Sequence, residues 1–203
     1  MNISYLPSIL PEEIILDTPG TTLFIGSTVS GDCTVKLSHP EAKAVVIILQ
    51  HGAGAVTTDL TLTQKHLAPN SVSHIFVRAL LTDQSAYHHR GMIHIENNAP
   101  GSVATLETRG LLLSPDARFQ AIPSLEILPN DVTCHHKATA GPLDGAQKHY
   151  LETRGLTPKE SEQLLTIGFM NGALDFLKLH CSDEKILLEF YNWLEQELKK
   201  YYV

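Results

Sequence analysis

The densest group of side chains that could bind a metal is the run Cys134, His135 and His136. Thiolate is a soft ligand and imidazole a borderline one, and both bind iron well. In a β-strand, residues 134 and 136 point to the same face, so Cys134 and His136 could converge while His135 points away. Two ligands do not make a closed site, since structural zinc needs four, and a partner chain or cofactor would supply the rest. The alternative is a buried cysteine and a hydrogen-bonded histidine at the end of a sheet.

A second group comprises His88, His89, His94 and Glu96. Its order is similar to the metal sites of cupins, which are small barrels, although the close His-x-His pair is missing. The alternation of His94 and Glu96 with isoleucines predicts the outward face of a half-buried strand, and therefore surface histidines. A small metal-dependent β-fold enzyme is the alternative.

The remaining candidates favour structural roles. The run His51-Gly52-Ala53-Gly54 could form a phosphate loop or an oxyanion hole, but no Gly-Lys-Ser/Thr follows it and no Gly-x-Ser-x-Gly occurs in the chain. Glycines that let a strand turn are the simpler interpretation. The run from His66 to Ser71 is typical of a turn before a strand. We assign no chemistry to Cys33 or Cys181.

The composition fits a packed domain and excludes several classes of function. The 203 residues are 43% hydrophobic, with a formal net charge of −7 and no basic stripe, which argues against nucleic-acid binding. No apolar run reaches the roughly 20 residues of a membrane span, and the N-terminus lacks the features of a secretory signal. Three widely spaced cysteines make a poor disulfide framework. We therefore expect a cytoplasmic protein that binds neither nucleic acid nor membrane.

Up to about residue 141, short β-branched runs separated by turn residues predict strands, and strong helix signals are absent. This pattern is compatible with a sandwich, a barrel or a β-solenoid. We favour the solenoid because the predicted strands are unusually short and because Gly, Asn, Asp and Ser recur between them, although no clean sequence period is visible.

After Gly141 the pattern becomes helical. Asp144 with Gln147 predicts a reciprocal cap for a helix that ends at Gly155. Thr157-Pro158-Lys159-Glu160 predicts a capping box for a second helix. Ser182 is the expected cap of a third, with Lys199 and Lys200 at its C-terminal end. The predicted units are thus a β-domain over 1–141 and a helical subdomain over 142–203.

The stretch from residue 66 to residue 170 resembles the C-terminal half of the SufB/SufD proteins, the scaffold subunits of the SUF iron–sulfur cluster assembly system. The carrying segments are HLAPNSVSHI (66–75), GMIHIENNAPGSVA (91–104), LLLSPDARFQAIPSLEILPNDVTCHHKATAGPLD (111–144) and YLETRGLTPKESEQLLTIGFM (150–170). The resemblance implies a mainly β fold, a right-handed parallel β-helix (β-solenoid) followed by a small C-terminal α-helical subdomain. It also implies pairing of two β-helices through their last turns, and docking of a SufC-type ABC ATPase on the helices.

Within the resemblance, His136 matches the histidine of D-type subunits, and Cys134 matches a cysteine two residues before it. Thr108 occupies the position of the interface cysteine of B-type subunits, so the chain is D-like. Lys137 replaces a glycine, and we expect it to be solvated. Family members usually carry a helical N-terminal region and a longer β-helix, whereas this chain begins in strand sequence. We therefore expect a short scaffold that pairs with a SufB-like subunit or with a second copy of itself.

Two hypotheses follow from the resemblance. In the first, the chain is a non-catalytic SufD-like scaffold on which His136, with Cys134 as second ligand or sulfur acceptor, supports a transient iron–sulfur cluster or iron, with no tightly bound cofactor. In the second, it is a structural interaction module that has lost cluster chemistry, as the missing B-type cysteine suggests.

Overall fold

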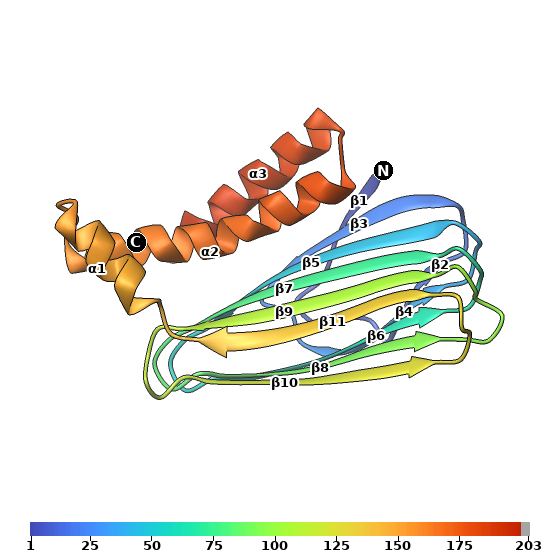
Figure 1. The fold of residues 1–203 in the computed structure, drawn as a ribbon, viewed down its shortest axis with the longest axis horizontal. Coiled ribbons are helices and arrows are strands. Elements are labelled where there is room, and N and C mark those ends of the chain that lie inside the picture. Colours follow the sequence, from blue (N-terminus) through green and yellow to red (C-terminus); the bar gives the residue numbers. More distant parts are fainter. Residues whose placement is uncertain (200–203) are drawn as a thin grey trace.

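The computed structural model describes residues 1–199, in which the chain forms eleven strands followed by three helices (Figure 1). Successive strands alternate between two sheets, and every pairing is parallel. The first sheet holds, in spatial order, β1 (Asn2–Tyr5), β3 (Gly20–Ser27), β5 (Ala42–Gly52), β7 (Val72–Leu81), β9 (Val103–Leu112) and β11 (Thr133–Gly141). The second holds β2 (Glu13–Leu16), β4 (Gly31–Leu37), β6 (Thr57–His66), β8 (Ala86–Ile95) and β10 (Arg118–Ile127). This is a β-solenoid with a helical C-terminal part, and the predicted fold class is confirmed.

The turns of the solenoid differ slightly in length. Lys43 pairs with Val72, Val72 with Val103, and Val103 with Thr133, so successive turns advance by 29, 31 and 30 residues. This variation explains why the sequence has no clean period. The expectation of unusually short strands was wrong, because the strands from β6 to β10 have ten residues each.

Turn residues stack on one another from one turn of the solenoid to the next. Gly54 has a φ of 64°, and its N–H donates to the Asp83 carboxylate at 2.8 Å, while the Asp83 N–H donates to Ser114 Oγ at 2.8 Å. Gly54 is therefore a turn glycine, as predicted from the run that begins at His51. The left-handed backbone it adopts costs little only without a Cβ.

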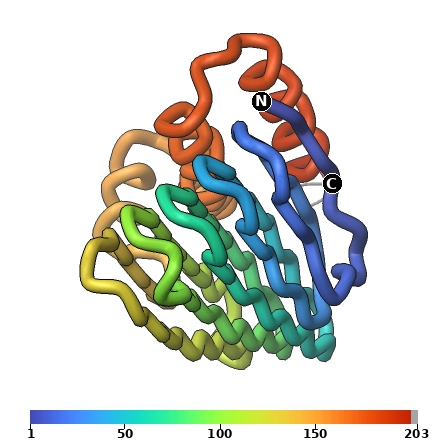
Figure 2. The backbone as a smooth tube through the Cα atoms, turned by 90° about the vertical axis from the view of Figure 1, so that its right-hand side faces the viewer, coloured from blue at the N-terminus to red at the C-terminus, as the bar shows by residue number. Residues whose placement is uncertain are grey.

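The two sheets enclose an apolar interior, and the helices cover the outer face of the first sheet (Figure 2). Alternate residues of each strand face inward and outward, as the period of two requires. In β5, Ala44, Val46 and Ile48 pack in the interior, while Val45, Ile47 and Leu49 pack against the helices. Both faces of this sheet are thus buried, which explains the continuous apolar run of β5.

The helices are α1 (Gly145–Thr153), α2 (Pro158–His180) and α3 (Glu184–Lys199). Asp144 caps α1 by accepting from the N–H groups of Ala146 and Gln147, and Gly155 follows the helix at a φ of 98°. The capping box of Thr157 and Glu160 is present in full. The predicted cap at Ser182 was wrong. Asp183 holds that position, because its carboxylate accepts from the N–H of Lys185 at 3.0 Å and α3 begins at Glu184.

The change from strands to helices falls between Gly141 and Gly145, close to the predicted boundary at 141/142. The division into two domains stays a prediction, and its end, with Lys200, lies outside the described residues. Within the described part of the chain, no helix is long and apolar enough to cross a membrane.

Arg78 on β7 contacts both α2 and the solenoid. Its guanidinium lies 3.6 Å from the centroid of the Phe76 ring and 5.4 Å from that of Phe169 on α2. One nitrogen donates to the Glu107 carboxylate at 2.7 Å. A second nitrogen donates to the Val77 carbonyl at 3.3 Å. Only 6% of the Arg78 side chain is exposed, so a single carboxylate is the one opposite charge that compensates it, beside this carbonyl and two aromatic faces.

Candidate functional site

Cys134 and His136 lie on the inner face of β11, the last strand of the first sheet. In the parallel register they pair with Ala104 and Leu106, both of which are buried in the interior. Cys134 packs against the interior cluster, whereas His135 and Lys137 point to the exposed outer face. The same-face arrangement expected from strand alternation is thus present. The outer edge of β11 carries no strand among residues 1–199, so both side chains sit at the end of the solenoid.

Burial favours the neutral form of both side chains. It lowers the pKa of His136 and raises the pKa of the Cys134 thiol. His136 Nδ1 is buried and finds no hydrogen-bond partner in the described structure. A neutral imidazole can bind a metal at once, while a thiol must first lose its proton, which a bound cation favours.

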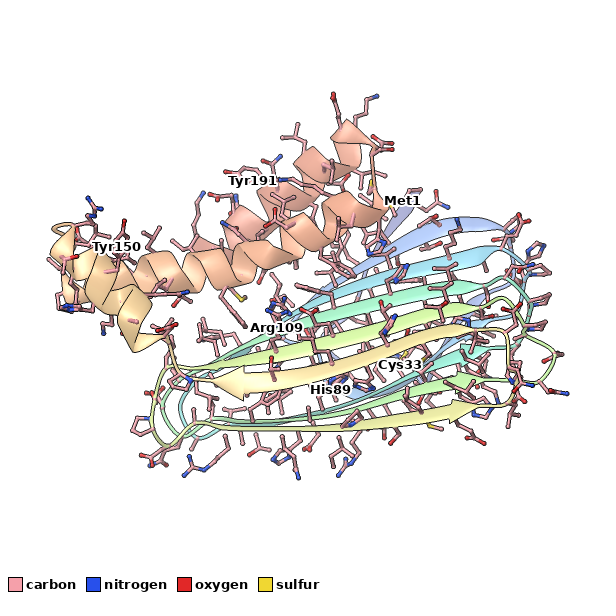
Figure 3. The ribbon with its side chains drawn as sticks, in the orientation of Figure 1. Met1, Cys33, His89, Arg109, Tyr150 and Tyr191 are labelled. Atoms are coloured by element: carbon pink, nitrogen blue, oxygen red, sulfur yellow. The ribbon has the colours of Figure 1, made fainter. Side chains whose placement is uncertain are left out.

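His89 faces His136 across the interior, which sequence reasoning missed. Figure 3 shows His89 between the two sheets, and only 2% of the residue is exposed. Its Nδ1 bonds to Thr108 Oγ1 at 2.9 Å. Burial, with a smaller contribution from His136, lowers the pKa of His89 to about 4. The site therefore contains two imidazoles where the sequence indicated one.

The expectation of surface histidines was wrong for His89 and holds in part for its neighbours. His88 lies on the outer face 3.0 Å from Asp59, and His94 is partly buried between Glu96 and Glu126, 3.1 Å from each carboxylate. His89 lies an even number of residues from Ile93 and Ile95, which are fully buried, and therefore on the same face of the strand. Extending the strand back to Ala86 would have placed it inside.

The cupin-like alternative is not supported. The fold is a solenoid and not a small barrel, and His89 lies on the face of β8 opposite to His88 and His94. Over residues 1–199, no group of three or more histidines, cysteines or carboxylates is arranged to hold a metal ion. Any metal at Cys134 and His136 would therefore need further ligands besides these two side chains, as the sequence indicated.

Lys137 lies on the face of β11 opposite to Cys134 and His136. It lines a groove of about 350 Å³ between β11 and α2, together with His74, His135 and His180. The interpretation of a solvated cation is consistent with this position, and the Lys137 side chain does not project toward the candidate ligands.

The last turn exposes apolar side chains that the preceding turn buries. Leu125 and Ile127 on β10 pair in register with Ile93 and Ile95, which are fully buried. Leu125 and Ile127 themselves are 51% and 38% exposed, because the described chain adds no further turn over them. The open end thus combines an apolar inner surface with two unpaired strand edges. Unpaired backbone groups at such edges can form hydrogen bonds with a strand of another chain.

A second apolar surface lies on the helices. Tyr150 and Leu164 are 56% and 48% exposed, and they line a hollow of about 470 Å³ between α1 and α2. The hollow also contacts Leu151 and Leu165. Exposed apolar hollows of this kind favour the binding of a partner protein.

Comparison with known protein families gives a match that covers most of the chain. Residues 21–169 match the family described as "SUF system FeS cluster assembly, SufBD core domain". The chain therefore belongs to the SufB/SufD family of the SUF system of iron–sulfur cluster assembly. The resemblance drawn from the sequence is confirmed at this level.

The similar relatives include both types of subunit. The iron–sulfur cluster assembly protein SufD of Bacillus subtilis (strain 168) is 33% identical over 133 residues, which cover 66% of this chain and 30% of that protein. SufB of the same strain is 23% identical over 174 residues, covering 80% of this chain and 36% of that protein. The SufBD family protein Mb1496 of Mycobacterium bovis is 28% identical over 136 residues, or 67% of this chain and 16% of that protein. The chain thus spans about a third or less of the length of these relatives.

Proposed function

We propose that the chain acts as a SufD-like, non-catalytic scaffold component of iron–sulfur cluster assembly. The observation that carries the proposal is the position of Cys134 and His136, side by side on the inner face of an edge strand at the open end of the solenoid. Imidazole and thiolate both bind iron. Because the chain offers so few ligands, a cluster held there would need a partner and could be released again.

The partner at the open end is a SufB-like subunit or a second copy of this chain. Leu125 and Ile127 offer the apolar inner surface, and the edges of β10 and β11 offer unpaired backbone groups. Two such ends joined about a twofold axis would bury both and bring the two candidate sites together.

The hollow between α1 and α2 is the proposed docking surface for a SufC-type ABC ATPase, which would supply the nucleotide hydrolysis. Tyr150 and Leu164 would be its apolar anchors, since interfaces gain most from such residues near their centre. We also propose a cytoplasmic location, because the three cysteines remain free thiols.

The alternative is a structural interaction module without cluster chemistry. It is favoured by Thr108, which stands where the resemblance places the B-type cysteine. Thr108 is fully buried and bonds to His89, so this position presents no thiol at the end of the solenoid.

Anaerobic reconstitution with iron and sulfide separates the two functions. The chain would be tested alone, with a SufC-type ATPase and with a SufB-like subunit, by visible absorption and by mass in solution. We expect cluster absorption in the wild type that falls in Cys134→Ala and His136→Ala. His135→Ala is the control, because His135 lies on the same strand but on the opposite face. If every sample stays colourless while the complexes form, the structural module is the correct function.

The two surfaces have matched controls. Leu125→Lys is expected to abolish pairing, while Ile15→Lys, on β2 at the other end of the solenoid and 58% exposed, should leave it intact. Leu164→Asp is expected to abolish ATPase binding, while Leu179→Asp, which is 79% exposed on the same helix but outside the hollow, should not. Equal effects of a variant and its control would refute the corresponding surface.

A further inference from the structure

His89 is the residue at the site that the proposed function leaves without a role. It is almost fully buried, and Thr108 satisfies only its Nδ1. Its Nε2 is buried and has no hydrogen-bond partner within residues 1–199, and the same is true of His136 Nδ1. A buried polar atom without a partner destabilises the folded state. Two of them in neighbouring rings call for a binding partner, such as a water or an ion.

The two rings converge on one point beside Gly91. The Cε1 atoms of His89 and His136 each lie 3.4 Å from the position that a Cβ on Gly91 would take. In imidazole, Cε1 is bonded to both ring nitrogens, so each unpaired nitrogen is one bond away from this point of approach. Because Leu106 Cδ2 would lie 2.2 Å from such a Cβ, only glycine fits there, and both rings keep their access.

The hydrogen bond to Thr108 is compatible with the tautomer of His89 that binds a metal through Nε2. A hydroxyl oxygen can accept from the Nδ1–H of His89, which leaves a lone pair on Nε2. Histidines that bind metals almost always donate their other ring N–H in this way, and the donated bond fixes the orientation of the ring.

We propose that His89 is a second imidazole ligand at the His136 site, and that the two residues together bind a divalent iron-type cation inside the last turns of the solenoid. His89 binds through Nε2 and His136 through Nδ1, with Thr108 as the positioning residue. This rests on the proposed role of His136 and deepens it, because iron would be held by this chain before sulfide or a partner supplies the remaining ligands.

Cobalt(II) alone is the probe that tests the pair, with visible absorption and calorimetry on the intact chain. We expect one cobalt ion per chain, and affinity at least tenfold weaker in His89→Ala and in His136→Ala. Thr108→Val should weaken cobalt binding by about 10–100-fold, the usual cost of removing such an orienting partner. His88→Ala is the control, since His88 is the next residue on the same strand and faces outward.

Each outcome decides the proposal. If His136→Ala weakens cobalt binding and His89→Ala does not, His89 is no ligand, while the proposed role of His136 survives. If the wild type binds no cobalt, the paired site is refuted, and the reconstitution with partners still judges the scaffold function. His89→Gln retains most of the volume and can still bond to Thr108, so it replaces His89→Ala if that variant fails to fold. Its cobalt affinity must then fall by the same factor.

Discussion

The pair of Arg78 and Glu107 yields the sharpest test of how the helices are held on the solenoid. Glu107→Gln keeps the shape of the side chain but removes the charge that Arg78 faces. The guanidinium would remain between Phe76 and Phe169 with 6% of its side chain exposed. Stripping one partner from a fully buried pair costs about 3–5 kcal/mol. Because the Glu107 side chain is 28% exposed and water can follow, we expect Glu107→Gln to lower the free energy of unfolding by about 2–3 kcal/mol.

The reverse substitution should cost less. Arg78→Met leaves a carboxylate that is partly solvated and lies 3.0 Å from Arg109 Nε. The loss is then mainly the cation–π contact, about 1 kcal/mol. The double variant should be no less stable than Glu107→Gln alone, because the unpaired buried charge is gone.

Urea unfolding would measure these differences, followed by helical circular dichroism and by the fluorescence of the single tryptophan, Trp193, which lies on α3. Glu13→Gln is the control, because its ion pair with Lys36 is exposed and should contribute at most about 0.5 kcal/mol. If Glu107→Gln stays within 0.5 kcal/mol of the wild type, or costs less than Arg78→Met, the reasoning about the buried charge is refuted.

Three further predictions concern the interior. The Tyr87 hydroxyl is buried and has no hydrogen-bond partner among the described residues, so Tyr87→Phe should leave the free energy of unfolding unchanged or raise it by up to about 2 kcal/mol, as measured by thermal unfolding. Tyr191→Phe on the surface is the control and should leave the free energy of unfolding unchanged. A clear loss of stability in Tyr87→Phe would reveal a partner for the hydroxyl. Gly91→Ala should destabilise by about 1–3 kcal/mol, because its Cβ would clash with Leu106, whereas Gly168→Ala, with open space around it in α2, should stabilise by about 0.5–1 kcal/mol; equal effects would contradict the packing argument. Burial lowers the pKa of His66 and of His74 to about 4, with His180, Lys43 and His66 adding to the effect at His74. Between pH 6.5 and 4 the unfolded chain therefore binds protons that the folded chain does not, and stability should fall on acidification through this range; His66→Gln should flatten the slope of unfolding free energy against pH by up to about 1.4 kcal/mol per pH unit, and an unchanged slope would show that His66 is not held neutral.

The fold was predictable where a local signal had one physical meaning. The capping box at Thr157 and Glu160 starts α2 because two backbone N–H groups at a helix start need acceptors, and these two side chains supply them. Strand alternation likewise placed Cys134 and His136 on one face. Asp183 displaced Ser182 as the cap of α3 because both residues can accept from a helix N-terminus, and the position of the first helical turn decides between them.

The site was only half predictable, because its second half depends on register. The parity of His89 with Ile93 and Ile95 could have placed it in the interior, but no local signal says which residue it meets there. The residue that His89 meets is set by the lengths of the solenoid turns between the two strands, and successive solenoid turns in the first sheet advance by 29 to 31 residues. Because β8 and β11 belong to different sheets, one residue more or fewer in a turn would move His136 to the other face or past His89.

Thr108 connects the departure from the B-type pattern with the interior pair. A cysteine at this position would face His89 from the same place, but a thiol is a weak partner for a ring N–H and would itself compete for a metal. The threonine hydroxyl is instead a good hydrogen-bond acceptor, and it is a weaker ligand for iron than imidazole is. When the hydroxyl accepts from Nδ1–H, the lone pair of His89 is on Nε2, one bond from the Cε1 atom that lies beside Gly91 together with Cε1 of His136. In the proposed site, a threonine at position 108 is therefore compatible with two imidazole ligands, and a chain with the D-type pattern would bind a cation through His89 and His136.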